Sequence, residues 1–142
     1  MNKQSIKFFV IFCCCMIFSV VAVKAQSKPV FEIQIPFEFV VNDRVLPSGT
    51  YSIGRLNADN PDLLILKNTE GKTKIIFQTQ RLNGGSPNGE SRLTFYRFGN
   101  IYLLDCIWAS GEIYGNRLPA GKLGRKRLRE DFKPQVTSLR GN

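Results

Sequence analysis

Polar and apolar residues alternate along the chain just after residue 30. The apolar set occupies the odd positions, with mostly polar residues between them: Phe31, Ile33, Ile35, Phe37, Phe39 and Val41. A period of two gives a β-strand one apolar face. Pro36 has no amide hydrogen to donate to a neighbouring strand, so we expect it to divide this run into two shorter strands.

Further short strands follow, separated by turn residues. Residues 63–66 are continuously apolar, residues 74–79 alternate in part, and Glu70-Gly71 lies between them in a segment typical of a hairpin. No helical pattern occurs before residue 120. About seven strands at this spacing predict an all-β fold, either an antiparallel β-sandwich or a small open barrel.

The clearest hairpin turns at Gly99-Asn100, because glycine at the first central position favours a type II′ turn. In that register Phe95 faces Leu104 and Leu93 faces Cys106, so the predicted core face holds Leu93, Phe95, Leu104, Cys106 and Trp108. The opposite face is mixed, and four of its apolar or aromatic residues would form a binding patch if nothing covered them: Tyr96, Phe98, Ile101 and Leu103.

Residues 1–25 have the three parts of an export signal. Lys3 and Lys7 precede the apolar run 8–21, and small residues end at Ala25, after which we expect cleavage. The alternative is an uncleaved anchor, because the apolar stretch approaches the about 17 residues that span a bilayer. Export to a periplasm or to the outside follows, and the cleaved chain would keep no transmembrane helix.

Cleavage changes the meaning of the four cysteines. Residues 13–15 are all cysteine and leave with the signal, so only Cys106 remains and no internal disulfide can form. We expect Cys106 to be a buried, inert thiol and Trp108 to pack inward. An ordinary apolar core must therefore hold the domain together.

The 142 residues carry a net charge of +9, and this charge is unevenly distributed. The signal contributes +3, residues 26–116 form a β-domain with nine basic and nine acidic side chains, and residues 117–142 form a basic C-terminal tail with +6. The candidate anion-binding residues of this tail are Arg117, Lys122, Arg125, Lys126, Arg127 and Arg129. The tail is expected to be either a solvated, frayed end or partly helical, since Gly121, Gly124 and Pro134 weaken a helix.

Histidine is absent, which removes Ser-His and Cys-His nucleophile pairs and the usual catalytic zinc sites. The Asp59-Asn60-Pro61-Asp62 loop is typical of a turn rather than of a calcium site, and Asp105 is expected to pair with Arg92 across the hairpin. We therefore predict no catalytic, metal or cofactor-binding residue and no cofactor. A hydrolase that works without histidine stays as the enzymatic alternative.

Several motifs carry a family resemblance. They are residues 31–39 (FEIQIPFEF), 46–51 (LPSGTY), 93–104 (LTFYRFGNIYLL), Trp108 and the basic end. Over most of the mature chain the sequence resembles a family of small exported bacterial β-proteins of acidobacterial type, to which no activity is assigned. The resemblance implies export and a β-fold and supplies no catalytic residue. Tails of that family follow Leu-Pro with a dense Arg and Glu helix, which Gly121 and Gly124 dilute here.

Together these features predict an exported, non-enzymatic β-domain that binds or scaffolds in the cell envelope. The alternative is a binder of anionic surfaces, either lipid or acidic polysaccharide, that acts through the basic tail. The partner is then an unidentified envelope protein or such a surface. Nucleic acid is not expected, because export separates the protein from it and no recognition motif accompanies the charge.

Overall fold

The computed structural model describes residues 29–130 and 135–141, most of which lie in strands. The predicted signal, with its three cysteines, lies outside the described residues. The elements are β1 (Pro29–Ile35), β2 (Phe39–Val41), β3 (Arg44–Leu46), β4 (Gly49–Arg55), β5 (Leu63–Asn68), β6 (Lys74–Gln78), β7 (Gln80–Asn83), β8 (Arg92–Phe98), β9 (Ile101–Trp108), β10 (Tyr114–Arg117), α2 (Lys122–Arg129) and β11 (Gln135–Arg140).

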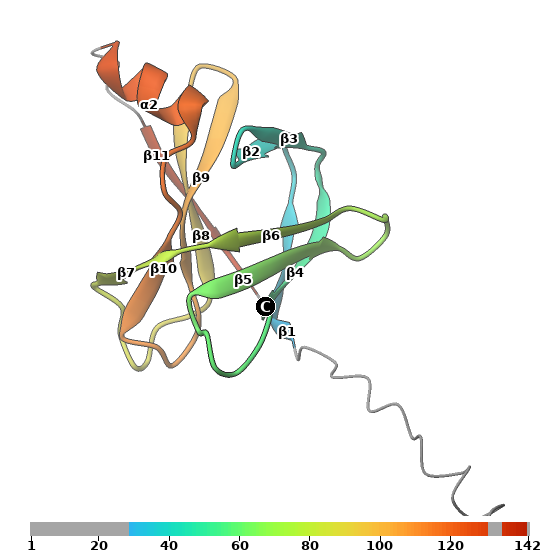
Figure 1. Ribbon diagram of the computed structural model, residues 1–142, viewed down its shortest axis with the longest axis vertical. Coiled ribbons are helices and arrows are strands. Elements are labelled where there is room, and N and C mark those ends of the chain that lie inside the picture. Colours follow the sequence, from blue (N-terminus) through green and yellow to red (C-terminus); the bar gives the residue numbers. More distant parts are fainter. Residues whose placement is uncertain (1–28, 131–134, 142) are drawn as a thin grey trace, which may run out of the picture.

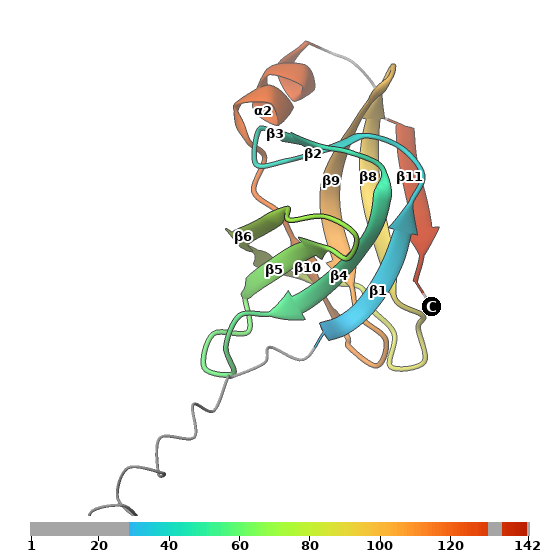
Figure 2. The same cartoon turned by 90° about the vertical axis from the view of Figure 1, so that its right-hand side faces the viewer.

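The strands form two sheets that pack face to face, as Figures 1 and 2 show. The first sheet has the order β1-β4-β5-β6, and the second has the order β11-β8-β9-β10-β7, all antiparallel. The β2–β3 hairpin joins the second sheet through one parallel pairing, Val40 with Leu103. The all-β sandwich prediction is confirmed.

More strands are present than the about seven expected, because β3, β7, β10 and β11 were not predicted. The first run ends at Ile35 and resumes at Phe39, so Pro36 divides it as predicted. A second run changes sheets at Thr79: β6 belongs to the first sheet and β7 to the second. This continuous segment turns the corner between the two layers.

The core lies between the sheets and is rich in aromatic rings. Phe39 contacts Tyr51 and Phe95 edge to face, with ring centroids 5.2 Å and 5.8 Å apart. The Tyr51 hydroxyl donates to the Pro47 carbonyl oxygen at 2.7 Å, which satisfies the only polar atom of this buried side chain. The predicted odd-position face is confirmed, with Phe31, Ile33, Ile35, Phe39 and Val41 buried and Phe37 packed at the rim of the core.

The β8–β9 hairpin has the predicted register only near its turn. Gly99 has a positive φ of 61°, and Phe95 pairs with Leu104 as expected. Beyond that pair β9 holds one extra residue, Asp105, and the register shifts. Leu93 therefore faces Ile107, because one inserted residue exchanges the two faces of a strand.

This bulge places Cys106 and Trp108 on the outer face of the hairpin, so the predictions that Cys106 faces Leu93 and that Trp108 packs inward were wrong. Ile107 takes the core position expected for Cys106, and Thr94 of the outer face pairs with Cys106. Cys106 is nevertheless buried, at 1% exposure, and Trp108 is half-buried beside it. The thiol is thus buried as predicted but does not face Leu93.

The C-terminal segment is more ordered than a frayed end. Its predicted partial helix is α2, and the strand β11, which the pattern did not predict, forms six residue pairs with β8. Leu139 of β11 packs against the core cluster. Within the described residues, no helix has the length and apolar character needed to cross a membrane.

Candidate functional site

The helix α2 lies at one end of the sandwich, beside the β2–β3 hairpin (Figures 1 and 2). Asn42 and Asp43 turn this hairpin with φ values of 47° and 62°, a conformation that both residue types tolerate. The Asp43 carboxylate reaches the first turn of α2, where it accepts hydrogen bonds from the backbone amides of Lys122 at 2.9 Å and Leu123 at 3.0 Å. A residue 79 positions away thus caps the helix.

Gly121 makes this cap possible, because a β-carbon there would lie 2.5 Å from Asp43 Oδ1. The glycine that weakens the helix in the sequence therefore admits the carboxylate that stabilises it. The two backbone hydrogen bonds lower the pKa of Asp43 below its ordinary 3.8, and the charges of Arg125 and Lys122 act in the same direction. The carboxylate is ionised and complements the positive end of the helix.

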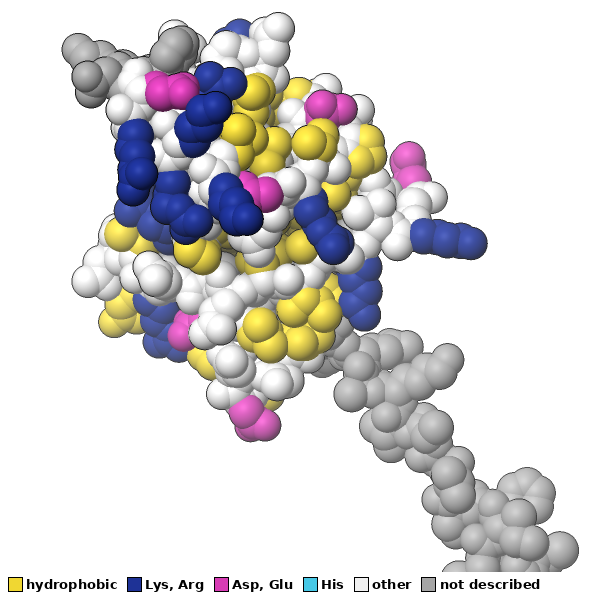
Figure 3. Space-filling model, turned by 45° about the horizontal axis from the view of Figure 1, so that its top comes forward, with side chains coloured by type: hydrophobic (Ala, Val, Ile, Leu, Met, Phe, Trp, Pro, Cys, Tyr) yellow, Lys and Arg dark blue, Asp and Glu magenta, His cyan; other side chains and the backbone are white. Residues whose placement is uncertain are grey.

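Four basic side chains share the outward face of α2. Lys122, Arg125, Lys126 and Arg129 are spaced by three, one and three residues, the spacing of one helix face, and all four are exposed. With Glu130 they border a shallow surface groove. Figure 3 shows Lys and Arg side chains gathered on the end of the molecule where α2 lies. We call these four residues the basic face.

The other two predicted anion-binding residues lie elsewhere. Arg127 is half-buried and pairs with Glu130 at 3.3 Å. Arg117 is in β10, where its Nε donates to Asp105 at 3.0 Å and a terminal nitrogen donates to the Tyr96 hydroxyl at 3.1 Å. Asp105 raises the pKa of Arg117 and offsets its charge, so Arg117 is not part of the basic face.

The prediction that Asp105 pairs with Arg92 was therefore wrong. The bulge turns Asp105 toward β10 and Arg117, whereas Arg92 lies over the Trp108 ring, 4.9 Å from its centroid. The Trp108 indole donates to Thr94 Oγ1 at 3.2 Å.

Burial is the largest of the influences that raise the pKa of the Cys106 thiol to about 12. Arg117 lowers that pKa to a smaller extent. The thiol is protonated near neutral pH, whereas a nucleophile or metal ligand needs the thiolate.

A cavity of about 300 Å³ lies between α2, the β2–β3 hairpin and the outer face of β8 and β9. Three of the four residues predicted as an apolar patch line it, namely Tyr96, Phe98 and Leu103, whereas Ile101 does not. Phe98 is buried and the others are half-buried. The helix α2 thus covers most of the predicted patch, and the cavity lies between the helix and the patch.

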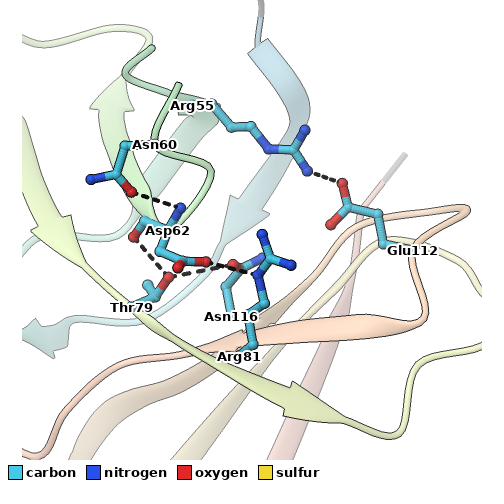
Figure 4. A network of polar contacts seen from close by, with 7 residues as sticks. All are labelled: Arg55, Asn60, Asp62, Thr79, Arg81, Glu112 and Asn116. Carbon is cyan, nitrogen blue, oxygen red and sulfur yellow. Dashed lines mark hydrogen bonds and ion pairs between the residues drawn. The ribbon is translucent and has the colours of Figure 1, made fainter. Parts of the chain in front are cut away.

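A second polar cluster lies where the two sheets meet (Figure 4). Asp62 accepts from Arg81 Nε at 3.1 Å, and its main-chain oxygen accepts from the Thr79 hydroxyl at 2.9 Å. An ion pair between Arg55 and Glu112 links the first sheet to the loop before β10. Figure 4 draws the members Arg55, Asn60, Asp62, Thr79, Arg81, Glu112 and Asn116. These contacts give the cluster a structural role.

The loop at residues 59–62, which contributes Asn60 and Asp62 to this cluster, forms a turn, as the sequence predicted. Asn60 Oδ1 accepts from the Asp62 amide at 3.2 Å, and Asn57 Oδ1 accepts from the Asn60 amide at 2.8 Å. Over residues 29–130 and 135–141, no three His, Cys, Asp or Glu side chains gather as a metal site would require.

No family model, curated protein or solved structure matches this chain. The resemblance to small exported bacterial β-proteins therefore stays a prediction. The two features of this chain that bear on function are the basic face and the cavity beneath α2.

Proposed function

We propose that this protein is an exported, non-enzymatic binding module that attaches to anionic lipid in the cell envelope through the basic face of α2. One observation carries the proposal: four exposed cationic side chains point outward from one helix that the domain holds in place. Export rests on the signal predicted in residues 1–25.

The charge distribution supports a single attachment surface. Residues 26–116 carry equal numbers of basic and acidic side chains, so the rest of the body contributes little net attraction. Each Lys or Arg near an anionic membrane contributes about 1 kcal/mol at moderate salt. Four such residues on one face can act together, because the Asp43 cap fixes the start of the helix.

Anionic lipid is favoured over an envelope protein by the chemistry of this face. Four lysine and arginine side chains, with Leu128 as the one exposed apolar residue of the same helix, suit a dense, sequence-independent array of phosphates. Protein interfaces instead concentrate aromatic anchors and are depleted of lysine. An acidic polysaccharide offers a similar array of charge, and the experiment below distinguishes the two.

The test compares two double variants of the protein recovered after expression of the full chain. K122Q/K126Q removes two charges from the basic face, and K72Q/K74Q removes two exposed lysines from the first sheet region. Sedimentation with vesicles of phosphatidylglycerol and phosphatidylcholine measures binding at low salt. We expect K122Q/K126Q to bind about 30-fold more weakly, because about 2 kcal/mol is lost, and K72Q/K74Q to bind nearly as the parent does.

Equal losses in the two variants would contradict attachment through α2, and so would no binding by the parent. A parallel measurement uses polygalacturonate in place of vesicles. Retention on the polysaccharide without vesicle binding would assign the basic face to acidic polysaccharide and overturn the lipid proposal.

A further inference from the structure

The cavity beneath α2 combines a mainly apolar wall with a polar end. Its wall is formed by aliphatic and aromatic side chains from β2, β8, β9, α2 and the segment between β10 and α2: Val40, Phe98, Leu103, Leu104, Leu118 and Leu128. Its volume of about 300 Å³ is at the lower end of the range for small-molecule sites, which runs from about 300 to 1,000 Å³. A compact ligand could fit without any movement of the sheet.

Gly124 leaves space on the side of the cavity that α2 forms, because it has no side chain. It is the buried residue of α2 and lines the cavity. An alanine β-carbon at this position would lie 3.4 Å from the Ala120 β-carbon and 3.6 Å from Leu103 Cδ1, which are ordinary contact distances. Glycine weakens a helix interior relative to alanine, so close packing does not account for it. The missing side chain leaves space that a methyl group would fill.

The polar lining also includes Asn42, Asp43 and Gln80, and Tyr96 offers a donor beside an ion pair that has no net charge. The Tyr96 hydroxyl accepts from Arg117, which leaves its own proton available as a hydrogen-bond donor. The Arg117 guanidinium is held by the Asp105 carboxylate, whose side chain is only 11% exposed. A charged ligand would have to compete with this ion pair, whereas a neutral acceptor oxygen would not.

We infer that this cavity binds a compact, uncharged, largely apolar molecule that presents one carbonyl or hydroxyl oxygen to Tyr96. The apolar body of the ligand would lie under Gly124, against Phe98 and Leu103. This site is separate from the basic face, which points away from the cavity on the opposite side of α2. The two activities can therefore fail independently.

The probe is prodan, an uncharged naphthyl ketone whose fluorescence shifts to the blue in apolar surroundings. Titration of the protein recovered after expression of the full chain should give a saturable shift with one molecule bound. We expect Gly124→Leu, which fills the cavity from the helix, to weaken binding at least tenfold. Tyr96→Phe should weaken it about fivefold by removing the donor, whereas the matching naphthalene without the ketone should be unaffected by Tyr96→Phe.

Gly124→Ala is the control for a folding defect in the Gly124→Leu variant, since the alanine methyl group fits at contact distances and favours the helix. We expect it to weaken prodan binding while the melting temperature stays equal or rises. Lys126→Gln is the control on the basic face and should leave prodan binding unchanged while it weakens vesicle binding. The inference is overturned if prodan does not saturate, or if both Gly124 variants bind it as the parent does.

Discussion

At the scale of single residues, Asp43 determines where the charged helix lies. Its left-handed conformation is compatible with a two-residue turn, and its carboxylate holds the first two amides of α2. A residue of a short polar turn therefore caps the N-terminus of a helix whose own N-cap residue provides no side-chain hydrogen bond. The direction of the basic face depends on this contact.

The cap makes the helix sensitive to acid. The folded-state pKa of Asp43 lies below its ordinary 3.8, so its stabilisation is complete above pH 3.8 and is lost as the pH falls through the lower folded value. An NMR titration of the Asp43 carboxyl carbon should give a midpoint below 3.8, and the Lys122 and Leu123 amides should lose protection from exchange over the same range. A midpoint at or above 3.8 would show that the carboxylate does not cap α2.

Part of this site could be predicted from the sequence. The exposed basic residues and their spacing are visible in it, and Asn42-Asp43 is a recognisable turn pair. The cap was missed, because its two halves are 79 residues apart and no local pattern joins them. Gly121 was interpreted as a helix breaker for the same reason.

At the scale of elements, β11 connects the end of the chain to the sandwich. It pairs with β8 along six residues and places Leu139 against the core while Val136 stays 64% exposed. In chain order the basic helix lies between β10 and β11, and both of these strands belong to the same sheet. This arrangement makes α2 part of the domain surface.

A pair of substitutions tests whether β11 is an integral strand. Leu139→Ala should lower the free energy of unfolding by about 1 to 2 kcal/mol, because Leu139 is partly buried and packs against the core cluster. Val136→Ala, on the exposed side of the same strand, should change it by less than about 0.5 kcal/mol. Urea denaturation measures both. Equal, negligible effects would indicate that β11 does not pack in solution.

The elements also show where pattern reasoning fails. Alternation correctly predicted β1, which has one buried face, and the Gly99-Asn100 pair predicted the turn of the β8–β9 hairpin. β2 was also predicted, although all three of its residues are buried. The extra residue at Asp105 has no signature in the alternation, and it reversed the expected faces of Cys106 and Ile107. β11 is mostly exposed, with one apolar residue packed on the core, so its periodicity is too weak to predict a strand.

At the scale of the whole molecule, the protein is a neutral sandwich with a charged end. Segment charges of zero for residues 26–116 and +6 for 117–142 become a spatial asymmetry, because α2 places four of the basic residues on one face. The cavity lies directly beneath that helix. Attachment through the basic face would orient the cavity and the sandwich relative to the surface that is bound.

The salt dependence of vesicle binding tests this account most directly. The protein recovered after expression of the full chain, with its N-terminus verified at Gln26, is mixed with phosphatidylglycerol-containing vesicles at increasing ionic strength. We expect binding to fall at least tenfold between 20 mM and 300 mM salt, and to be absent on phosphatidylcholine alone, because salt screens exposed charges. Binding that is insensitive to salt, or equal on both vesicles, would contradict attachment through the basic face.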